Sequence, residues 1–265
     1  MSKLTEGTQN FWLQIRNYLL SSSLTIVIAF LALGWEVGST ITFFLALCFL
    51  WLLSDTKEKI LRTLPDRFDY RPANLQDYPL LSFTWLEQQT QELESLGFVQ
   101  LIDYTTGANP AFARCFAHPK HYCYAEVCQV FKANGESFSR QAVIVSAWEQ
   151  RWELANINRE VNITDSIAYG FWRNGKKIRI YHAISSLDNL LQNHLNWRQR
   201  MQTDLGIALL RDISWENYVR LEEDAVAYRK QALKKKILLL AMIEVTKFEL
   251  NPKSEWLGDY AKLVA

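Results

Sequence analysis

The chain has 265 residues, of which 49% are hydrophobic and 22% are charged, with 29 Lys and Arg against 28 Asp and Glu. Residues 72–265 hold 22 charges of each sign, which argues against a nucleic-acid-binding domain because such domains neutralise phosphates with excess positive charge. A phosphate-binding glycine loop, G-x-S-x-G and H-E-x-x-H are all absent from a chain with only 10 glycines. We therefore expect no cofactor and regard a catalytic role as the less favoured alternative.

The first predicted element is the apolar stretch 18–54, in which Glu36 is the only ionisable side chain apart from Tyr and Cys. A bilayer core about 30 Å thick is crossed by roughly 20 helical residues, so the stretch is long enough for two short spans. Gly34 and Gly38 interrupt it on either side of Glu36, which predicts a turn. We expect a transmembrane helical hairpin, preceded by a cytosolic segment at residues 1–17.

Two alternatives to a spanning hairpin were weighed. A re-entrant or in-plane hairpin remains open, because each arm is near the lower limit of length for a span. A cleaved signal peptide fits poorly, because a second apolar segment follows almost at once and no small-x-small cleavage site separates the two.

Positive charges near the spans predict the orientation of the chain in the membrane. Two of them, Lys3 and Arg16, precede the first arm, and the connecting loop has none. Five follow the second arm: Lys57, Lys59, Arg62, Arg67 and Arg71. Positive charges favour the cytosolic side, so we expect both termini and the main domain there, in a plasma or thylakoid-type membrane. Trp12, Trp35 and Trp51 are predicted to contact the membrane interfaces.

Residues 55–81 are predicted to form a juxtamembrane helix that ends at Pro65, followed by a linker with two further prolines. An α+β domain is expected to occupy residues 82–265. Its first helix is indicated by the capping-box spacing of Thr84 and Glu87 and by Gly97, where a helix would stop.

The pattern then becomes typical of strands, rich in β-branched and aromatic residues. Seven such stretches are 98–104, 112–118, 122–131, 138–148, 151–158, 166–173 and 177–183. Turn sequences separate them at 107–110, 119–120, 133–135 and 174–175, and Asn174-Gly175 is the strongest hairpin signal. Because short turns cannot connect parallel strands, we predict an antiparallel sheet of about six strands.

Helical periodicity returns at 186–206 and again over a longer stretch from about 215 to 250, which ends before Pro252. These two helices are expected to form a C-terminal α-hairpin. The order of helix, strands and two helices predicts the α+β class.

Two segments, FTWLEQQTQELESLGF (83–98) and FARCFAHPKHYCYAEV (112–127), lie downstream of the predicted membrane hairpin. In this combination the chain resembles uncharacterised cyanobacterial two-helix membrane proteins. The resemblance covers about a third of the chain, and it implies a host membrane without implying an activity.

Reactive side chains cluster at Cys115, His118, His121, Cys123 and Cys128. Thiolates and imidazoles are ligands that zinc prefers, so Cys115, His118, His121 and Cys123 are low-probability metal candidates. Side chains alternate between faces along a strand, which places Cys123 and Cys128 on opposite sides of the sheet. The favoured interpretation is that these cysteines are small buried hydrophobes and the histidines are exposed in a turn, without a metal. An odd number of cysteines in the soluble part also fits a reducing compartment.

Two further groups of residues are candidates for contacts. Trp and Arg are common at binding hot spots, and five of them gather in two segments as a predicted partner contact: Trp148, Arg151, Trp152, Trp172 and Arg173. A basic run on the last helix ends with Lys234, Lys235 and Lys236, which are predicted to contact anionic lipid; a solvated helix face is the alternative.

Two functions remain open from the sequence. The favoured one is a non-catalytic, membrane-anchored protein whose cytosolic domain binds a protein partner in an assembly, regulatory or scaffold role. The other is a membrane-tethered domain that holds a small ligand, or carries out a reaction, in a pocket between the sheet and its helices.

Overall fold

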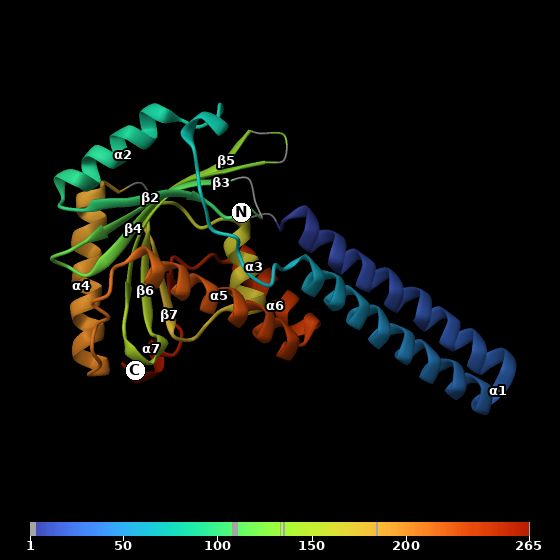
Figure 1. Cartoon of the computed structure of the whole chain (residues 1–265). Coiled ribbons are helices and arrows are strands. Elements are labelled where there is room, and N and C mark those ends of the chain that lie inside the picture. The colour runs from blue at the N-terminus through green and yellow to red at the C-terminus, as the bar shows by residue number, and fades with distance from the viewer. Residues whose placement is uncertain (1–3, 108–110, 133, 135, 184, 265) are drawn as a thin grey trace. The chain divides into compact units, whose positions relative to one another are not determined.

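A computed structural model describes residues 4–107, 111–132, 134, 136–183 and 185–264. Over these residues the chain has seven α-helices and one mixed sheet of eight strands, so the α+β class is confirmed (Figure 1). The chain divides into two compact units. The first holds the residues up to Leu64 together with Asn162–Trp172 and Arg229–Pro252, and the second holds the remainder.

The first unit is built on α1 (Glu6–Thr63), an apolar helical element whose backbone leaves the helical region at Gly34, with φ 80° and ψ −179°. Tyr18 Oη donates a hydrogen bond to the carbonyl of Leu45 at 2.6 Å, and the Tyr18 ring stacks on Phe49. In a straight helix, 27 residues would separate these groups by about 40 Å. The chain therefore reverses at Gly34, and the two arms of α1 lie side by side (Figure 1).

Both ends of α1 pack against α3 (Ile163–Trp172) and α6 (Leu238–Leu250). Their shared core contains Phe171, Leu233, Leu238, Ala241, Met242 and Val245, with Phe11, Trp12, Leu53, Ile60, Leu61, Leu64 and Trp172 around it. The buried carboxylate of Glu249 on α6 accepts hydrogen bonds from the hydroxyls of Thr5, Thr8 and Ser166. This polar contact joins the start of α1 to α3 and α6.

The strand predicted at 166–173 is wrong, because residues 166–172 belong to α3. Aromatic and β-branched residues made the segment resemble a strand, but its N-terminus is capped as a helix. Asn162 Oδ1 accepts from the amides of Thr164 at 2.9 Å and Asp165 at 3.3 Å, and Asp165 Oδ2 accepts from the amide of Asn162 at 2.8 Å. These reciprocal bonds form a capping box, which the sequence carries as Asn-x-x-Asp.

The second unit is organised around the sheet, whose strands follow one another in chain order. They are β1 (Arg71–Pro72), β2 (Val99–Thr105), β3 (Ala111–His118), β4 (Cys123–Phe131), β5 (Ser137–Ala147), β6 (Glu153–Ile157), β7 (Lys177–Tyr181) and β8 (Glu255–Trp256). All neighbours are antiparallel except β6 and β7, which are parallel. The predicted six-stranded antiparallel sheet is thus corrected to a mixed sheet of eight.

The parallel pair is possible because the connection between β6 and β7 contains a helix, α3, rather than a tight turn. Asn174-Gly175 lies between α3 and β7, so the predicted hairpin at this position is also wrong. The turn predicted at 107–110 lies mostly outside the described residues, as do parts of the one at 133–135. The turn at 119–120 joins β3 to β4 as predicted.

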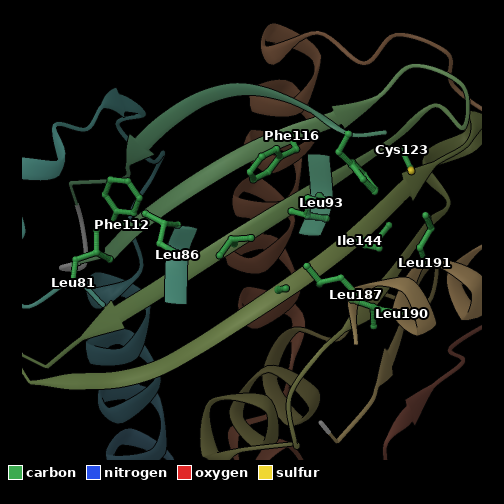
Figure 2. Packing of buried hydrophobic residues seen from close by; sticks show 14 of the residues in the cluster. Leu81, Leu86, Leu93, Phe112, Phe116, Cys123, Ile144, Leu187, Leu190 and Leu191 are labelled. Carbon is green, nitrogen blue, oxygen red and sulfur yellow. The ribbon is translucent and has the colours of Figure 1, made fainter. Parts of the chain in front are cut away.

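One face of the sheet is covered by α2 (Phe83–Ser95) and α4 (Leu187–Leu205). Figure 2 shows Phe112 and Phe116 of β3 directed toward Leu86 and Leu93 of α2, within a cluster that also contains Ile144, Leu187, Leu190 and Leu191. The end of α2 lies where the sequence predicts, because Gly97 adopts a φ of 92° that other residues rarely adopt.

The other face of the sheet is covered by the first part of α5 (Trp215–Lys235). Tyr218 there packs with Tyr104, Cys115, Tyr124 and Cys128. Because α4 and this part of α5 lie on opposite faces, they do not form the predicted α-hairpin. The long helix predicted over 215–250 is in fact two, α5 and α6, which are separated at Lys236 and Ile237. A short helix, α7 (Tyr260–Leu263), follows β8.

Candidate functional sites

The first candidate site is the exposed apolar surface of α1. This helix is long and apolar enough to cross a membrane, and only 6% of its most apolar 18-residue window is buried. Leu31, Trp35 and Trp51 are 83%, 78% and 69% exposed. Soluble proteins rarely leave so continuous an apolar surface in water, and such a surface marks an interaction with lipid or with another apolar surface.

The three tryptophans predicted at the membrane interfaces lie in different surroundings. Trp35 is next to the reversal at Gly34 and packs against Phe30, and Trp51 is exposed near the end of the second arm. Trp12 is partly buried, and its indole N–H donates to Thr246 Oγ1 of α6 at 2.7 Å. Trp12 thus also holds α1 to α6.

The predicted lipid-contacting lysines lie where α5 ends and α6 begins. Lys234 and Lys235 are exposed, whereas Lys236 Nζ lies 2.7 Å from the carboxylate of Glu244. The ammonium of Lys57 in α1 donates to the carbonyl of Lys234 at 2.7 Å. The structure therefore places this basic segment beside the residues that directly follow the apolar part of α1.

The cysteine and histidine cluster is divided between the two faces of the sheet. Cys123 belongs to the cluster beneath α2 and α4, whereas Cys115 and Cys128 belong to the cluster beneath α5. The prediction that Cys123 and Cys128 lie on opposite faces of the sheet is confirmed. Cys115 and Cys123 are not cross-strand neighbours, because His118 is opposite Cys123 and Glu126 is opposite Cys115.

Both ring nitrogens of His118 make hydrogen bonds within the fold. Nε2 lies 3.1 Å from the carbonyl of Leu96, and Nδ1 accepts from the amides of Lys120 and His121. Burial lowers the pKa of His118 and of His121, and it raises the pKa of the Cys123 thiol to about 12. These shifts favour the neutral forms. His118 is not exposed as expected, because it is buried at the end of β3, where it closes the turn. Among the described residues no group of three or more His, Cys, Asp and Glu side chains is arranged to hold a metal.

A series of hydrogen-bonded polar side chains runs through the interior of the second unit. The sequence patterns do not predict it. Ser146 Oγ lies 2.8 Å from Nε2 of His194, and His194 Nδ1 lies 2.9 Å from Oδ1 of Asn156. The amide nitrogen of Asn156 lies 2.9 Å from Nε2 of His182. Because an amide oxygen only accepts, Nδ1 of His194 carries its proton and Nε2 accepts from the Ser146 hydroxyl.

This order of serine, histidine and asparagine matches the roles of nucleophile, base and orienting group in covalent catalysis. Its surroundings do not match, because Ser146, His194 and Asn156 are at most 1% exposed. Burial also lowers the pKa of His194 to about 3, far below the range in which a general base operates near neutral pH. These hydrogen-bonded side chains therefore form a satisfied polar network that joins α4 to β5 and β6.

Beneath α5, a third polar group surrounds Glu126 of β4. Its carboxylate accepts hydrogen bonds from the hydroxyls of Tyr104 and Tyr218. Burial raises the pKa of Glu126, although these two hydrogen bonds act in the opposite direction. Burial and the neighbouring Glu126 raise the pKa of both tyrosines, which therefore stay protonated donors. The arrangement holds α5 against the sheet.

A cavity of about 390 Å³ lies in the second unit between the 148–153 segment, β7 and α5. Charged lining residues of both signs are Glu149, Arg151, Glu153, Lys177, Arg220 and Asp224. Trp148 and Trp152 also line it, but they are only 1% and 6% exposed. Gln150 and Arg151 have φ of 58° and 66°, a left-handed conformation that is costly for residues other than glycine.

The residues predicted for partner contact are thus split. Trp148 and Trp152 belong to the core, so their rings are not a free recognition surface, while Arg151 is exposed at the cavity. Trp172 is partly buried in the first unit, and Arg173 is exposed in the second. Among the described buried side-chain nitrogen and oxygen atoms, only the indole nitrogen of Trp148 has no hydrogen-bond partner.

An exposed apolar patch of the second unit was missed by the sequence analysis. Leu80, Phe83 and Phe138 are 59%, 47% and 46% exposed. Gln129 of β4 donates to the carbonyl of Leu80, and Arg140 of β5, two residues after Phe138, donates to Ser82 Oγ, next to Phe83. The signal that could have revealed the patch is Phe138, an aromatic residue near the polar start of its strand.

Comparison of the chain with protein family models, with curated proteins and with solved structures found no match.

Proposed function

We propose that this chain is a non-catalytic membrane protein, anchored by α1 as a two-span hairpin, whose second unit binds a protein partner on the cytosolic side. The observation that carries the anchor is the exposed apolar surface of α1, which contains leucine, valine, isoleucine and phenylalanine side chains around both arms. In lipid these apolar side chains are out of contact with water. In water, each Å² of their exposed apolar surface would cost about 25 cal/mol.

The reversal at Gly34 supports a hairpin rather than a single span. It lies near the middle of the apolar stretch, and the positive charges lie beyond its two ends. Positive residues favour the cytosolic side of a membrane, so the loop with Trp35 is on the opposite side. The resemblance to cyanobacterial two-helix membrane proteins agrees with this arrangement.

Accessibility of introduced cysteines tests the topology. With Cys48 replaced by alanine, Trp35→Cys should react with a membrane-impermeant maleimide added to intact cells, and Lys59→Cys should react only after the membrane is permeabilised. Lys59 is a suitable position because its side chain is 74% exposed. Reaction of Lys59→Cys in intact cells would contradict the proposed orientation, and reaction of neither residue in intact cells would favour a re-entrant hairpin.

The patch formed by Leu80, Phe83 and Phe138 supports the partner-binding role. Arg140 follows Phe138 by two residues and donates to Ser82 Oγ, next to Phe83, and its guanidinium lies 5.6 Å from the ring centroid of Trp85. Aromatic residues and arginine are enriched where proteins bind one another. A partner that covers this patch would bury apolar area and retain the charge of Arg140 for an acidic group.

Pull-down of the full chain from solubilised membranes, followed by mass spectrometry, tests this role. Phe83→Asp and Phe138→Asp should each lose the specifically bound protein, because a carboxylate would be buried in the contact. Val99→Asp is the matched control, since Val99 is 57% exposed on β2. Equal recovery of the partner with all three variants would exclude the patch as the binding surface.

The cavity of about 390 Å³ favours a second candidate function, the binding of a small polar molecule. Its described lining contains carboxylates, guanidinium groups and Lys177, but no Ser, Thr, Cys or His side chain. Such a lining suits binding better than nucleophilic catalysis. A screen of zwitterionic metabolites by thermal shift would support this function if a stabilising compound lost its effect in Arg151→Gln.

A further inference from the structure

We infer that the junction of α5 and α6 is a second membrane-contact site, which binds anionic lipid headgroups through Lys234 and Lys235 and inserts Ile237 and Leu240 beneath them. This inference rests on the proposed membrane anchor, and it adds a site and a lipid class to it. All of its residues belong to the first unit.

The depth of the junction follows from its contacts with α1. Leu53 is the last apolar residue of the uncharged stretch that ends at residue 54, and Lys57 follows it by four residues, or about 6 Å of helix. The headgroup region of each leaflet is about 5–8 Å thick, so Lys57 lies within it when Leu53 is at the edge of the hydrocarbon. Because Lys57 Nζ is 2.7 Å from the carbonyl of Lys234, the end of α5 lies at the same depth.

Packing between the helices keeps the junction at this position. Leu233 and Leu238, on either side of it, are 0% and 4% exposed and belong to one cluster with Leu53 and Ile60 of α1. The junction is therefore fixed to the anchor by buried contacts on both sides. Its movement away from the membrane would require that this cluster opens.

Side chains at the junction have the polarity that an interfacial site needs. Lys234 and Lys235 are exposed, and neither has an ion-pair partner among the described residues. Ile237 is 62% exposed and Leu240 is 52% exposed, three residues further along the chain. Lysines with exposed large aliphatic side chains beside them suit a surface with anionic headgroups above hydrocarbon.

Other charged groups nearby do not cancel these lysines. Lys236 is paired with Glu244, and Asp55 of α1 is paired with Lys59 at 2.6 Å. Glu58 is paired with Arg62, so the carboxylates of this region already have cationic partners. Lys234 and Lys235 thus remain for phosphate or carboxylate groups of the lipid. In addition, the N-cap residue of α6, Ile237, forms no side-chain hydrogen bond to the start of the helix, so the positive end of the helix dipole adds to their charge.

The test uses the full chain in vesicles, with Cys48 replaced by alanine and an environment-sensitive fluorophore on one introduced cysteine. Leu240→Cys reports on the junction, and Leu31→Cys reports on the anchor. The remaining cysteines, Cys115, Cys123 and Cys128, do not compete for the label because they are buried. Quenching by lipids that carry a spin label is compared with quenching by aqueous iodide, in phosphatidylcholine vesicles with and without phosphatidylserine.

We expect lipid quenching of the Leu240 probe, stronger with phosphatidylserine present. Lys234→Gln with Lys235→Gln should abolish the increase that phosphatidylserine causes in the ratio of lipid quenching to iodide quenching, because the two lysines contribute to binding near an anionic surface. The charge-matched control, Lys120→Gln with Lys262→Gln, should leave the ratio unchanged. High salt should act like the lysine substitutions, because it screens exposed charges.

Three results would overturn the inference. Lipid quenching at Leu31 together with iodide quenching alone at Leu240 would reject the second contact and leave the anchor intact. Equal lipid quenching at Leu240 with and without phosphatidylserine, unaffected by the lysine substitutions, would reject headgroup recognition. Absence of lipid quenching at Leu31 would reject the proposed anchor itself, and the contact at the junction with it.

Discussion

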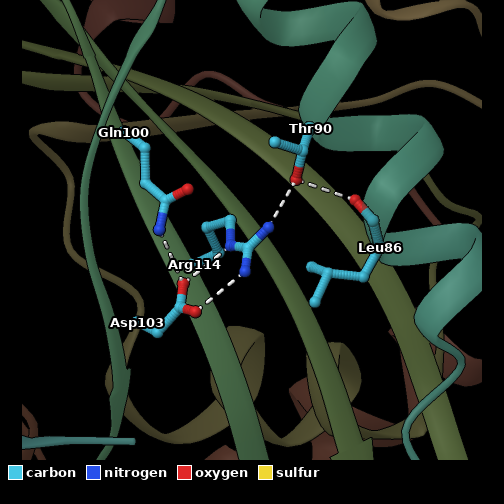
Figure 3. Close-up of polar contacts among 5 residues, drawn as sticks. All are labelled: Leu86, Thr90, Gln100, Asp103 and Arg114. Carbon is cyan, nitrogen blue, oxygen red and sulfur yellow. Dashed lines mark hydrogen bonds and ion pairs between the residues drawn. The ribbon is translucent and has the colours of Figure 1, made fainter. Parts of the chain in front are cut away.

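The guanidinium of Arg114 and the carboxylate of Asp103 form two parallel hydrogen bonds between β3 and β2, at 2.7 Å and 2.8 Å (Figure 3). These side chains are only 8% and 15% exposed. A third hydrogen bond, from Nη1 of Arg114 to Thr90 Oγ1 at 2.9 Å, reaches α2. The pair therefore joins two strands and a helix, and its removal tests how much this contact contributes to stability.

We predict that Asp103→Asn lowers the free energy of unfolding by about 3–5 kcal/mol, because Arg114 would keep a buried charge without its counter-ion. Replacing both residues, by Asp103→Leu with Arg114→Met, should recover most of that loss. Denaturant unfolding of the detergent-solubilised chain, followed by tryptophan fluorescence, measures both values. The prediction requires that the double variant loses less free energy of unfolding than Asp103→Asn does.

The exposed ion pair between Asp69 and Arg71 provides the control. Its side chains are 57% and 68% exposed, so water and salt already screen both charges. Asp69→Asn should therefore leave the free energy of unfolding nearly unchanged. If Asp69→Asn and Asp103→Asn were equally destabilising, burial would not be the reason for the effect at Asp103.

The second prediction concerns acid stability and His194. Its folded pKa of about 3 is below the ordinary value of 6.5, so the unfolded chain binds a proton more readily than the folded one. Stability from the neutral imidazole is present above pH 6.5 and is lost as the pH falls toward 3. The loss should have a slope of up to about 1.4 kcal/mol per pH unit.

His194→Gln isolates this contribution. Glutamine keeps a donor for Asn156 and an acceptor for Ser146 but cannot gain a proton, so its unfolding midpoint should depend less on pH than that of the wild type. Burial also lowers the pKa of His118, His121 and His182, and these residues leave part of the pH dependence in place. Identical pH profiles for the variant and the wild type would show that His194 does not contribute.

Local patterns in the sequence predict much of this fold. Alternation along β3 and β4 correctly separates Cys123 from Cys128, because the period of a strand holds wherever both faces are covered. The residues of α3 were predicted as a strand, because aromatic residues are typical of strands. The capping box at Asn162 and Asp165 indicates a helix instead. The relative direction of β6 and β7 was therefore predicted wrongly, because a helix in this connection allows the two strands to be parallel.

The polar sites were harder to predict, because their members are distant in the sequence. Ser146, Asn156 and His194 are separated by up to 48 residues and come from two strands and a helix. The junction residues Lys234 to Lys236 were recognised by their charge alone. Their contact with Lys57 depends on how α1, α5 and α6 pack, which a pattern along one segment does not contain.

The third prediction concerns the left-handed backbone at Gln150 and Arg151. Non-glycine residues in this region cost about 1–2 kcal/mol each, so Gln150→Gly and Arg151→Gly should raise the unfolding midpoint. The exposed position of both side chains means that little packing is lost. As a control, Glu149→Gly, next to them but outside the left-handed region, should be neutral or destabilising. Destabilisation by Arg151→Gly would instead indicate that the Arg151 side chain contributes to the fold.

The last prediction concerns the contact between α3 and α6 at Gly170. A Cβ atom there would lie 2.4 Å from Cγ2 of Val245 and 2.8 Å from the carbonyl oxygen of Ala241. Contacts this short require that the helices separate, so Gly170→Ala should lower the free energy of unfolding by about 1–3 kcal/mol despite the better helix propensity of alanine. Thermal unfolding of the full chain measures the loss.

A second substitution separates the two clashes at Gly170. Val245→Ala removes Cγ2 but not the backbone oxygen of Ala241, so Gly170→Ala with Val245→Ala should be rescued only in part. Gly7 of α1 is the matched control, since a Cβ there would meet nothing within 4 Å. Gly7→Ala should be neutral or stabilising by up to about 1 kcal/mol, because alanine loses less backbone entropy on folding. If Gly170→Ala were as well tolerated as Gly7→Ala, then α3 and α6 would not pack as closely as described. The cluster that includes Val245 and Leu238 would then be less rigid than the lipid contact at the α5–α6 junction requires.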